Sequence, residues 1–361
     1  MTIAAFILLV ALAAANGAND VSKGVATLAG AGVTRYRTAI VWGAAATLFG
    51  GLLSIVTGHA MGKLFSSGII GSHPVTTFAL AVLAGTLTWI TLASVLRLPV
   101  STTHALVGSL VGAGLLFAPG AIHWDGILIK VVTPLLVSIV VAYGISAVLG
   151  MAGQVWRWQR SRRPAPASAL AASESPGGAG TDDAAGRSTT TATVTAGTQT
   201  VARAPALAAR ALAGLHWLSS WATCTARALN DTPKIAAVGA FALIPAGMTA
   251  SQVTTTVAVA MGLGSLLGVR VARTLGERVV RMGHLEGFRA NACTAVLVGV
   301  GAQMGWPMST THVSSGAIAG IPGTKVSRLN PKTLRDFVIA WTVTPAVGGL
   351  VAAAVYFIIA H

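Results

Sequence analysis

The sequence predicts an all-α polytopic membrane protein, built as an inverted-topology repeat of two five-element halves. Three observations predict this fold. The chain of 361 residues is 54% hydrophobic and only 9% charged, and several of its apolar runs approach or exceed the roughly 20 residues that cross a bilayer. A set of polar motifs recurs in the second half in the same order. The basic residues of the loops are distributed oppositely in the two halves.

The first half, residues 1–152, divides into five predicted membrane elements. They cover about residues 3–33, 38–57, 76–96, 101–118 and 127–152. A soluble core helix of such length would show one polar face, and these runs show none. The third and fourth elements are either two full spans or a re-entrant hairpin. We expect a hairpin, in which residues near 101 reach the middle of the membrane.

The second half, residues 209–361, divides in the same way. Its elements cover about residues 209–245, 248–269, 288–304, 309–321 and 336–360. Between the halves, residues 153–208 are rich in Ala, Ser, Thr, Gly and Pro and have no apolar periodicity. This composition is typical of a flexible linker without chemistry of its own.

Two polar motifs indicate that the halves are copies. The first is Asn-Asp followed by a lysine, and its copies lie 211 positions apart: Asn19, Asp20 and Lys23 against Asn230, Asp231 and Lys234. The second is Ser-Thr-Thr-His after a proline, and its copies lie 208 positions apart: Ser101, Thr102, Thr103 and His104 against Ser309, Thr310, Thr311 and His312. The shared order and nearly constant offset predict a duplication.

Loop charges predict that the two copies are inverted. The loop after the first element carries Arg35 and Arg37, whereas its counterpart near 246–251 is uncharged. The loop near 58–75 holds one lysine, whereas its counterpart at 270–289 holds five arginines. By the positive-inside rule, we expect both termini to face outside and the linker to face the cytoplasm. We expect the protein to lie in the inner membrane of the cell. The same placement of the +15 net charge in loops argues against a nucleic-acid partner.

The Asn-Asp motifs predict cation sites. An aspartate at the bilayer centre costs about 2.5–3.5 kcal/mol on insertion scales, and this chain places one in each half. Gly17 predicts a local break of the first helix that frees backbone carbonyls. Carboxylate, amide and carbonyl oxygens suit Na⁺, or H⁺ on the carboxylate. Alternatively, Asp20 with Lys23 and Asp231 with Lys234 form structural ion pairs on one helix face. Either lysine, once released, could face an anion.

The Ser-Thr-Thr-His motifs predict an anion site. Proline two residues ahead of serine marks a helix start, and the hydroxyls cap exposed N–H groups. Two such N-termini inside the protein could hold one tetrahedral oxyanion between them. The alternative is simple capping. His104 and His312 are neutral donors to the anion, proton carriers or ordinary packed histidines.

With these motifs in place, the chain resembles a known family. The stretches NGANDVSKGVATLAG at 16–30 and ALNDTPKIAAVGAFAL at 228–243, with the paired P-x-STTH stretches, are similar to the inorganic phosphate transporter family, also called the Pit or sodium/phosphate symporter family. Its members commonly carry GANDVANA where this chain has GANDVSKG at 17–24. The resemblance covers roughly residues 1–150 and 215–360.

The resemblance implies a secondary carrier that imports phosphate with Na⁺ or H⁺, without a cofactor and as a homodimer in lipid. Some relatives carry sulfate, so another oxyanion is an alternative substrate. Divalent phosphate entering a negative cell opposes about 4.6 kcal/mol per 100 mV, which two cations would cancel. An anion channel is the rival function, but its polar lining would be continuous. Hydrolase and nucleotide-binding motifs are lacking, so we do not expect an enzyme.

Overall fold

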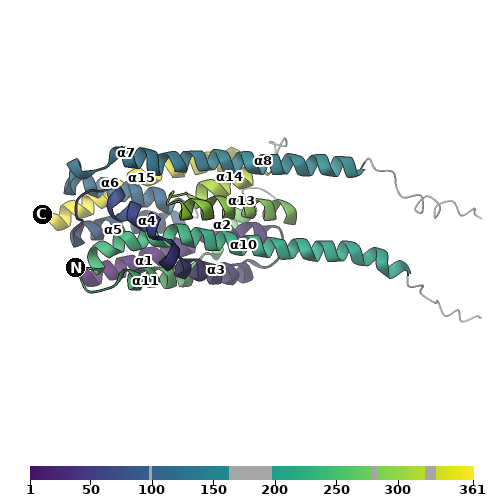
Figure 1. The fold of residues 1–361 in the computed structure, drawn as a ribbon, viewed down its shortest axis with the longest axis horizontal. Helices are drawn as coiled ribbons and strands as arrows, with labels where there is room; N and C mark the ends of the chain where they lie inside the picture. Colours follow the sequence, from purple (N-terminus) through teal and green to yellow (C-terminus); the bar gives the residue numbers. More distant parts are fainter. Residues whose placement is uncertain (97–99, 162–196, 279–282, 322–330) are drawn as a thin grey trace, which may run out of the picture.

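The computed structural model describes residues 1–96, 100–161, 197–278, 283–321 and 331–361, and within these ranges the chain forms helices and no β-strand. The helices run mostly along one axis and form an elongated bundle (Figure 1). Both chain ends lie at one end of the bundle, and the C-terminal part of α8 and the N-terminal part of α10 project from the other end (Figure 1). Most of the predicted linker and the basic stretches at 279–282 and 322–330 lie outside the described residues.

The first half contains the five predicted elements and additional short helices. The predicted elements correspond to α1 (Thr2–Asp20) with α2 (Ser22–Gly30), α3 (Tyr36–Thr57), α5 (Thr76–Val95), α6 (Thr102–Phe117) and α8 (Thr133–Ser161). The additional segments are α4 (His59–Lys63), η1 (Leu64–Gly68), η2 (Pro119–Ala121), α7 (Trp124–Ile127) and η3 (Leu128–Val132). The stretch at 97–99, where the tip of the expected hairpin falls, is not described.

The second half follows the same order. Its helices are α10 (Gly197–Leu243), α11 (Ala250–Ser265), α12 (Val269–Arg278), α13 (His284–Gln303), α14 (Thr310–Gly320) and α15 (Pro331–Ala360). Helices α8 and α10 continue into the stretch assigned to the linker. Among the described residues, five helices are long and apolar enough to cross a membrane, or up to six if α11 and α12, bent by 63°, form one span.

Helices of the first half pack directly on helices of the second half. Helix α6 of the first half packs on α15 of the second, and α14 of the second packs on α8 of the first. Likewise α1 packs on α11, and α3 packs on α10. Each contact has a counterpart with the halves exchanged, so the centre of the bundle is built from both halves.

The first helix is not broken at Gly17. Helix α1 continues to Asp20, and the only interruption before α2 is Val21, whose φ of −55° and ψ of −29° remain helical. Gly17 instead permits a close helix crossing, because a Cβ atom there would lie 2.0 Å from the carbonyl oxygen of Met261 on α11. The motif of the first half therefore lies on a nearly continuous helix.

Candidate functional site

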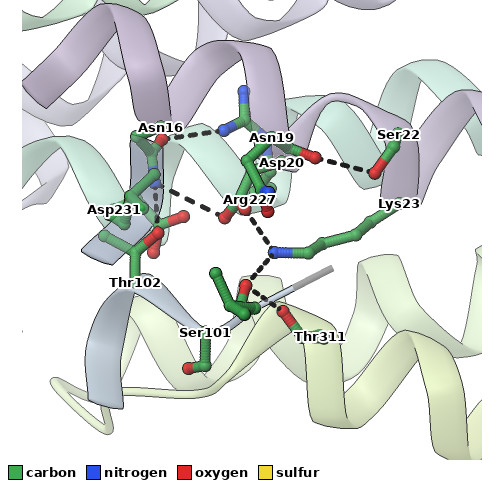
Figure 2. Close-up of polar contacts among 12 residues, drawn as sticks. Asn16, Asn19, Asp20, Ser22, Lys23, Ser101, Thr102, Arg227, Asp231 and Thr311 are labelled. Carbon is green, nitrogen blue, oxygen red and sulfur yellow. Dashed lines mark hydrogen bonds and ion pairs between the residues drawn. The ribbon is translucent and has the colours of Figure 1, made fainter. Parts of the chain in front are cut away.

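The first buried ion pair joins Lys23 of α2 to Asp20 of α1. The ammonium of Lys23 donates to Asp20 Oδ1 and, at 3.2 Å, to the backbone carbonyl of Val100. The other carboxylate oxygen of Asp20 accepts from Asn16 Nδ2 at 3.4 Å, and this amide also donates to Thr102 Oγ1 at 2.7 Å. Figure 2 shows these side chains converging from α1, α2 and the start of α6.

The second buried ion pair joins Lys234 to Asp231 on α10. The ammonium of Lys234 donates to Asp231 Oδ1 at 3.2 Å, to Thr103 Oγ1 at 2.7 Å and to the carbonyl of Met308 at 3.3 Å. Asn230 Nδ2 donates to the same Met308 carbonyl at 2.8 Å and to Asp231 Oδ1 at 2.9 Å. All these side chains are buried.

The two helices that begin in the Ser-Thr-Thr-His motifs, α6 and α14, are called the motif helices below. They begin beside each other, and a threonine of each contacts the backbone carbonyl that precedes the other. Thr311, in the first turn of α14, donates to the carbonyl of Val100, which precedes α6, at 2.8 Å. Thr103, in the first turn of α6, lies 3.4 Å from the carbonyl of Met308, which precedes α14. Each carbonyl therefore accepts from the lysine of its own half and the threonine of the other. This crossed pattern places the N-termini of both helices at one buried site.

Both helices start where the sequence predicts. Ser101 caps α6 by accepting from His104 N at 3.3 Å, and Ser309 caps α14 by accepting from His312 N at 3.3 Å. The two histidine rings pack with centroids 4.6 Å apart. His104 Nδ1 lies 2.7 Å from Ser101 Oγ, and His312 Nδ1 lies 3.4 Å from the carbonyl of Leu135. The predicted serine caps of both helices are thus confirmed. Thr310, which follows Ser309, is buried.

Arg227 also belongs to this buried charged cluster, although no sequence motif predicted a role for it. The cluster consists of Asp20, Lys23, Arg227, Asp231 and Lys234. The side chain of Arg227 is 0% exposed. Its guanidinium donates to Asn16 Oδ1 at 3.1 Å and to Thr47 Oγ1 at 2.7 Å. No ion pair between Arg227 and a carboxylate is found in the described part of the chain, and its Nε has no hydrogen-bond partner there. A charged residue inside an apolar element was the available signal, since such residues mark functional sites in membranes.

The cluster has an excess of positive charge. Lys23, Lys234 and Arg227 are buried with only two carboxylates, Asp20 and Asp231, among the described residues of the cluster. With all five groups ionised, one positive charge remains without a counterion. An uncompensated buried charge is strongly unfavourable, so the arrangement favours an anion. The dipoles of the two helix N-termini act in the same direction.

One predicted site residue points elsewhere. Asn19 Nδ2 donates to Ser94 Oγ on α5 at 3.1 Å, and the Asn19 carbonyl accepts from Ser22 Oγ at 2.7 Å. Its counterpart Asn230 contacts Asp231 and Met308 instead. In the described residues, Asn230 Oδ1 and Asp231 Oδ2 are buried acceptors without a hydrogen-bond partner. Both of these atoms belong to the Asn-Asp motif of the second half.

Comparison with known proteins identifies the family. A model of the phosphate transporter family matches residues 16–352. The chain belongs to the phosphate transporter family. This phosphate transporter is 26% identical over 352 residues to a Rhizobium meliloti protein described as "Probable low-affinity inorganic phosphate transporter", covering 95% of this chain and 91% of that protein. A Mycobacterium bovis protein of the same description is 27% identical over 377 residues, covering 99% of this chain and 78% of that protein.

A solved structure shares the fold of this phosphate transporter. It is described as "The sodium-dependent phosphate transporter", and it matches 99% of this chain and 98% of that chain with a TM-score of 0.78 at 23% identity. The family assignment confirms the predicted resemblance and a transport function rather than an enzymatic one. Together with the apolar helices, it identifies a multi-pass membrane protein.

Proposed function

We propose that this phosphate transporter is a secondary active importer that couples inorganic phosphate to Na⁺ or H⁺ by alternating access around the buried cluster. The observation that carries the proposal is the charge of that cluster. Three buried cations face two carboxylates at the meeting point of two helix N-termini. A tetrahedral anion would supply the missing negative charge and accept from the surrounding donors.

Each group at the site has a proposed role. The anion contacts come from the two motif helices and the two lysines: Ser101, Thr102, Thr103, His104, Ser309, Thr310, Thr311, His312, Lys23 and Lys234. We add Arg227, because its guanidinium is the cation without a carboxylate partner in the described cluster. The groups proposed for the coupling cation are the Asn-Asp motifs: Asn19, Asp20, Asn230 and Asp231.

The crossed contacts support an inverted repeat, and an inverted repeat supports alternating access. Each carbonyl before a motif helix accepts from one side chain of each half. Tilting one half against the other would break and remake those bonds at one depth while the site stays central. We propose repeat boundaries at 1–152 and 209–361, with 153–208 as a cytoplasmic linker and both termini outside. In Figure 1 both chain ends lie at the same end of the bundle, which supports the placement of both termini on one side of the membrane.

The environment of the protein is also proposed. Large apolar side chains are exposed along α8 and α15, among them Leu136, Val140, Leu350 and Ile358. Surfaces of this kind suit contact with lipid tails in the inner membrane. The homodimer rests on the family resemblance alone, and the mass of the purified protein in a mild detergent tests it.

Uptake of labelled phosphate into proteoliposomes tests the function. Na⁺ and H⁺ gradients are imposed separately, with equal phosphate on both sides at the start. The proposal expects accumulation against the phosphate gradient in at least one condition. Equilibration of the label without a net rise of internal phosphate would indicate an anion channel instead. Equal inhibition by sulfate and phosphate would indicate a general oxyanion permease.

A further inference from the structure

We infer that Lys23 and Lys234 act as tethered cations in the two positions that a coupling Na⁺ would take, so that this chain moves phosphate independently of Na⁺. The inference rests on the proposed function and excludes Na⁺ as its coupling ion. It comes from the atoms that surround the two ammonium groups.

The ammonium of Lys234 is enclosed by three kinds of oxygen. It bonds a carboxylate oxygen of Asp231, the hydroxyl of Thr103 and the backbone carbonyl of Met308. Carboxylate, hydroxyl and carbonyl oxygens are the donors that hard metal cations prefer. An ammonium needs the same acceptors, because it offers three N–H donors and no acceptor. The site that could hold a metal cation is thus filled by the chain itself.

Lys23 repeats this arrangement in the first half. Its ammonium bonds the Asp20 carboxylate (Figure 2). It also donates to the carbonyl of Val100. Val100 and Met308 precede the two motif helices at equivalent positions, 208 residues apart. In both halves the lysine bonds the aspartate and the carbonyl that precedes the motif helix. An ion pair formed by chance would not be expected to recur in this way. The arrangement also provides one fixed cation for each Asn-Asp motif.

Na⁺ could bind these oxygens only by expelling the lysine. Both ammonium groups are buried, with side-chain exposures of 1% for Lys23 and 0% for Lys234. Expulsion would leave a buried ammonium without its carboxylate, which is strongly unfavourable. A second cation on the same carboxylate would meet like-charge repulsion at short range. The two carboxylates therefore do not fit Na⁺ while the lysines are present.

The wild-type protein gives the first test. Phosphate uptake into proteoliposomes is measured at one fixed proton gradient, with either sodium or choline as the external cation at equal ionic strength. We expect equal initial rates in the two salts. A rate that depends on sodium would overturn the inference and would assign Na⁺ to the free acceptors Asn230 Oδ1 and Asp231 Oδ2.

Replacing the lysines gives the second test. Lys23→Asn and Lys234→Asn remove the ammonium and offer an amide oxygen, so each variant should bind radioactive sodium that the wild type does not bind. Phosphate binding by these variants should become about tenfold stronger in sodium than in choline, the size of one charge-assisted hydrogen bond. Lys23→Met and Lys234→Met remove the charge without a ligand and should show no sodium effect. The exposed Lys63 on α4 provides the matched control Lys63→Asn.

The outcomes separate this inference from the proposed function. Absence of phosphate uptake by the wild type in both salts would contradict the proposed function. Sodium binding is measured without transport, so it still decides the inference. Sodium bound by the wild type, or by neither asparagine variant when both fold as judged by size-exclusion chromatography, would overturn it.

Discussion

Arg227 donates a hydrogen bond of 3.1 Å to the amide oxygen of Asn16, the residue that lies 211 positions earlier and therefore at the equivalent place of the other half. Two equivalent positions meet at the centre of the molecule, one as a cation and the other as a neutral amide. This asymmetry is the source of the net positive charge in the buried cluster.

Arg227→Met should weaken phosphate binding by about tenfold or more, because a charge-assisted hydrogen bond is worth about 1.5–3 kcal/mol. The substitution also makes the charges of the cluster balance. Titration of purified protein with labelled phosphate measures the change. Arg210, an exposed residue of the same helix, provides the control Arg210→Met. Equal affinities of both variants would remove Arg227 from the anion site.

Thr103→Val and Thr311→Val should each raise the apparent Kd for phosphate by about tenfold. Valine keeps the shape of threonine and removes the hydroxyl that contacts Lys234 Nζ in one case and the Val100 carbonyl in the other. Thr88, whose hydroxyl bonds a carbonyl of its own helix on an exposed face, serves as the control Thr88→Val. Unchanged binding in both site variants would leave these motifs as helix caps only.

Asp20→Asn should separate binding from coupling. The variant keeps the size of the side chain and adds one net positive charge to the cluster, so phosphate should bind at least as tightly as to the wild type. Accumulation driven by a cation gradient should collapse, because the proposed coupling carboxylate is gone. Binding and uptake are measured on the same preparation. Normal accumulation by the variant would make Asp20 a structural partner of Lys23.

Asp231→Asn should reduce the preference for phosphate over sulfate. Near neutral pH phosphate still carries a proton and sulfate does not, so a carboxylate that accepts this proton rejects sulfate. Asp231 Oδ2 has no hydrogen-bond partner in the described residues, whereas both oxygens of Asp20 are bonded. Competition binding should therefore show stronger sulfate displacement in Asp231→Asn than in Asp20→Asn. Equal sulfate displacement by the two variants would argue against this role.

Gly17→Ala and Gly264→Ala should destabilise the bundle. A Cβ atom on Gly17 would lie 2.0 Å from the Met261 carbonyl, and one on Gly264 would lie 2.2 Å from the Ala14 carbonyl. Overpacking of this kind costs about 1–3 kcal/mol, so the Tm in detergent should fall. Gly144→Ala on α8 meets nothing within 4 Å and should leave the Tm unchanged or raise it. Three equal Tm values would contradict the close crossing of α1 and α11.

The helices, and the positions at which α6 and α14 begin, are predictable from the sequence because both depend on local signals. Apolar length predicts α3 and α5, and proline followed by serine predicts the start of α6 at Thr102. The same signals could not predict the function of Gly17, since a helical glycine and a helix break look alike in sequence. The distinction depends on the partner helix α11, which packs against that glycine.

Arg227 could not be predicted from the residues that the two halves share. Asn16, the equivalent of Arg227, is uncharged, so the comparison of halves did not single out the arginine. Similarly, equivalent motifs predicted equivalent roles for Asn19 and Asn230, but only Asn230 contacts the motif carbonyl at Met308. Differences between the two halves become apparent only from the three-dimensional contacts. At this site, the difference between Arg227 and Asn16 determines the net charge of the cluster.

An experimental structure of the purified protein with phosphate tests most directly whether the five-charge cluster is the phosphate site. The account predicts density for one tetrahedral anion within hydrogen-bond distance of Arg227 and of the first turns of α6 and α14. Density for the anion at another place, with the ion pairs of Lys23 and Lys234 unchanged and no anion between the two helix N-termini, would contradict it.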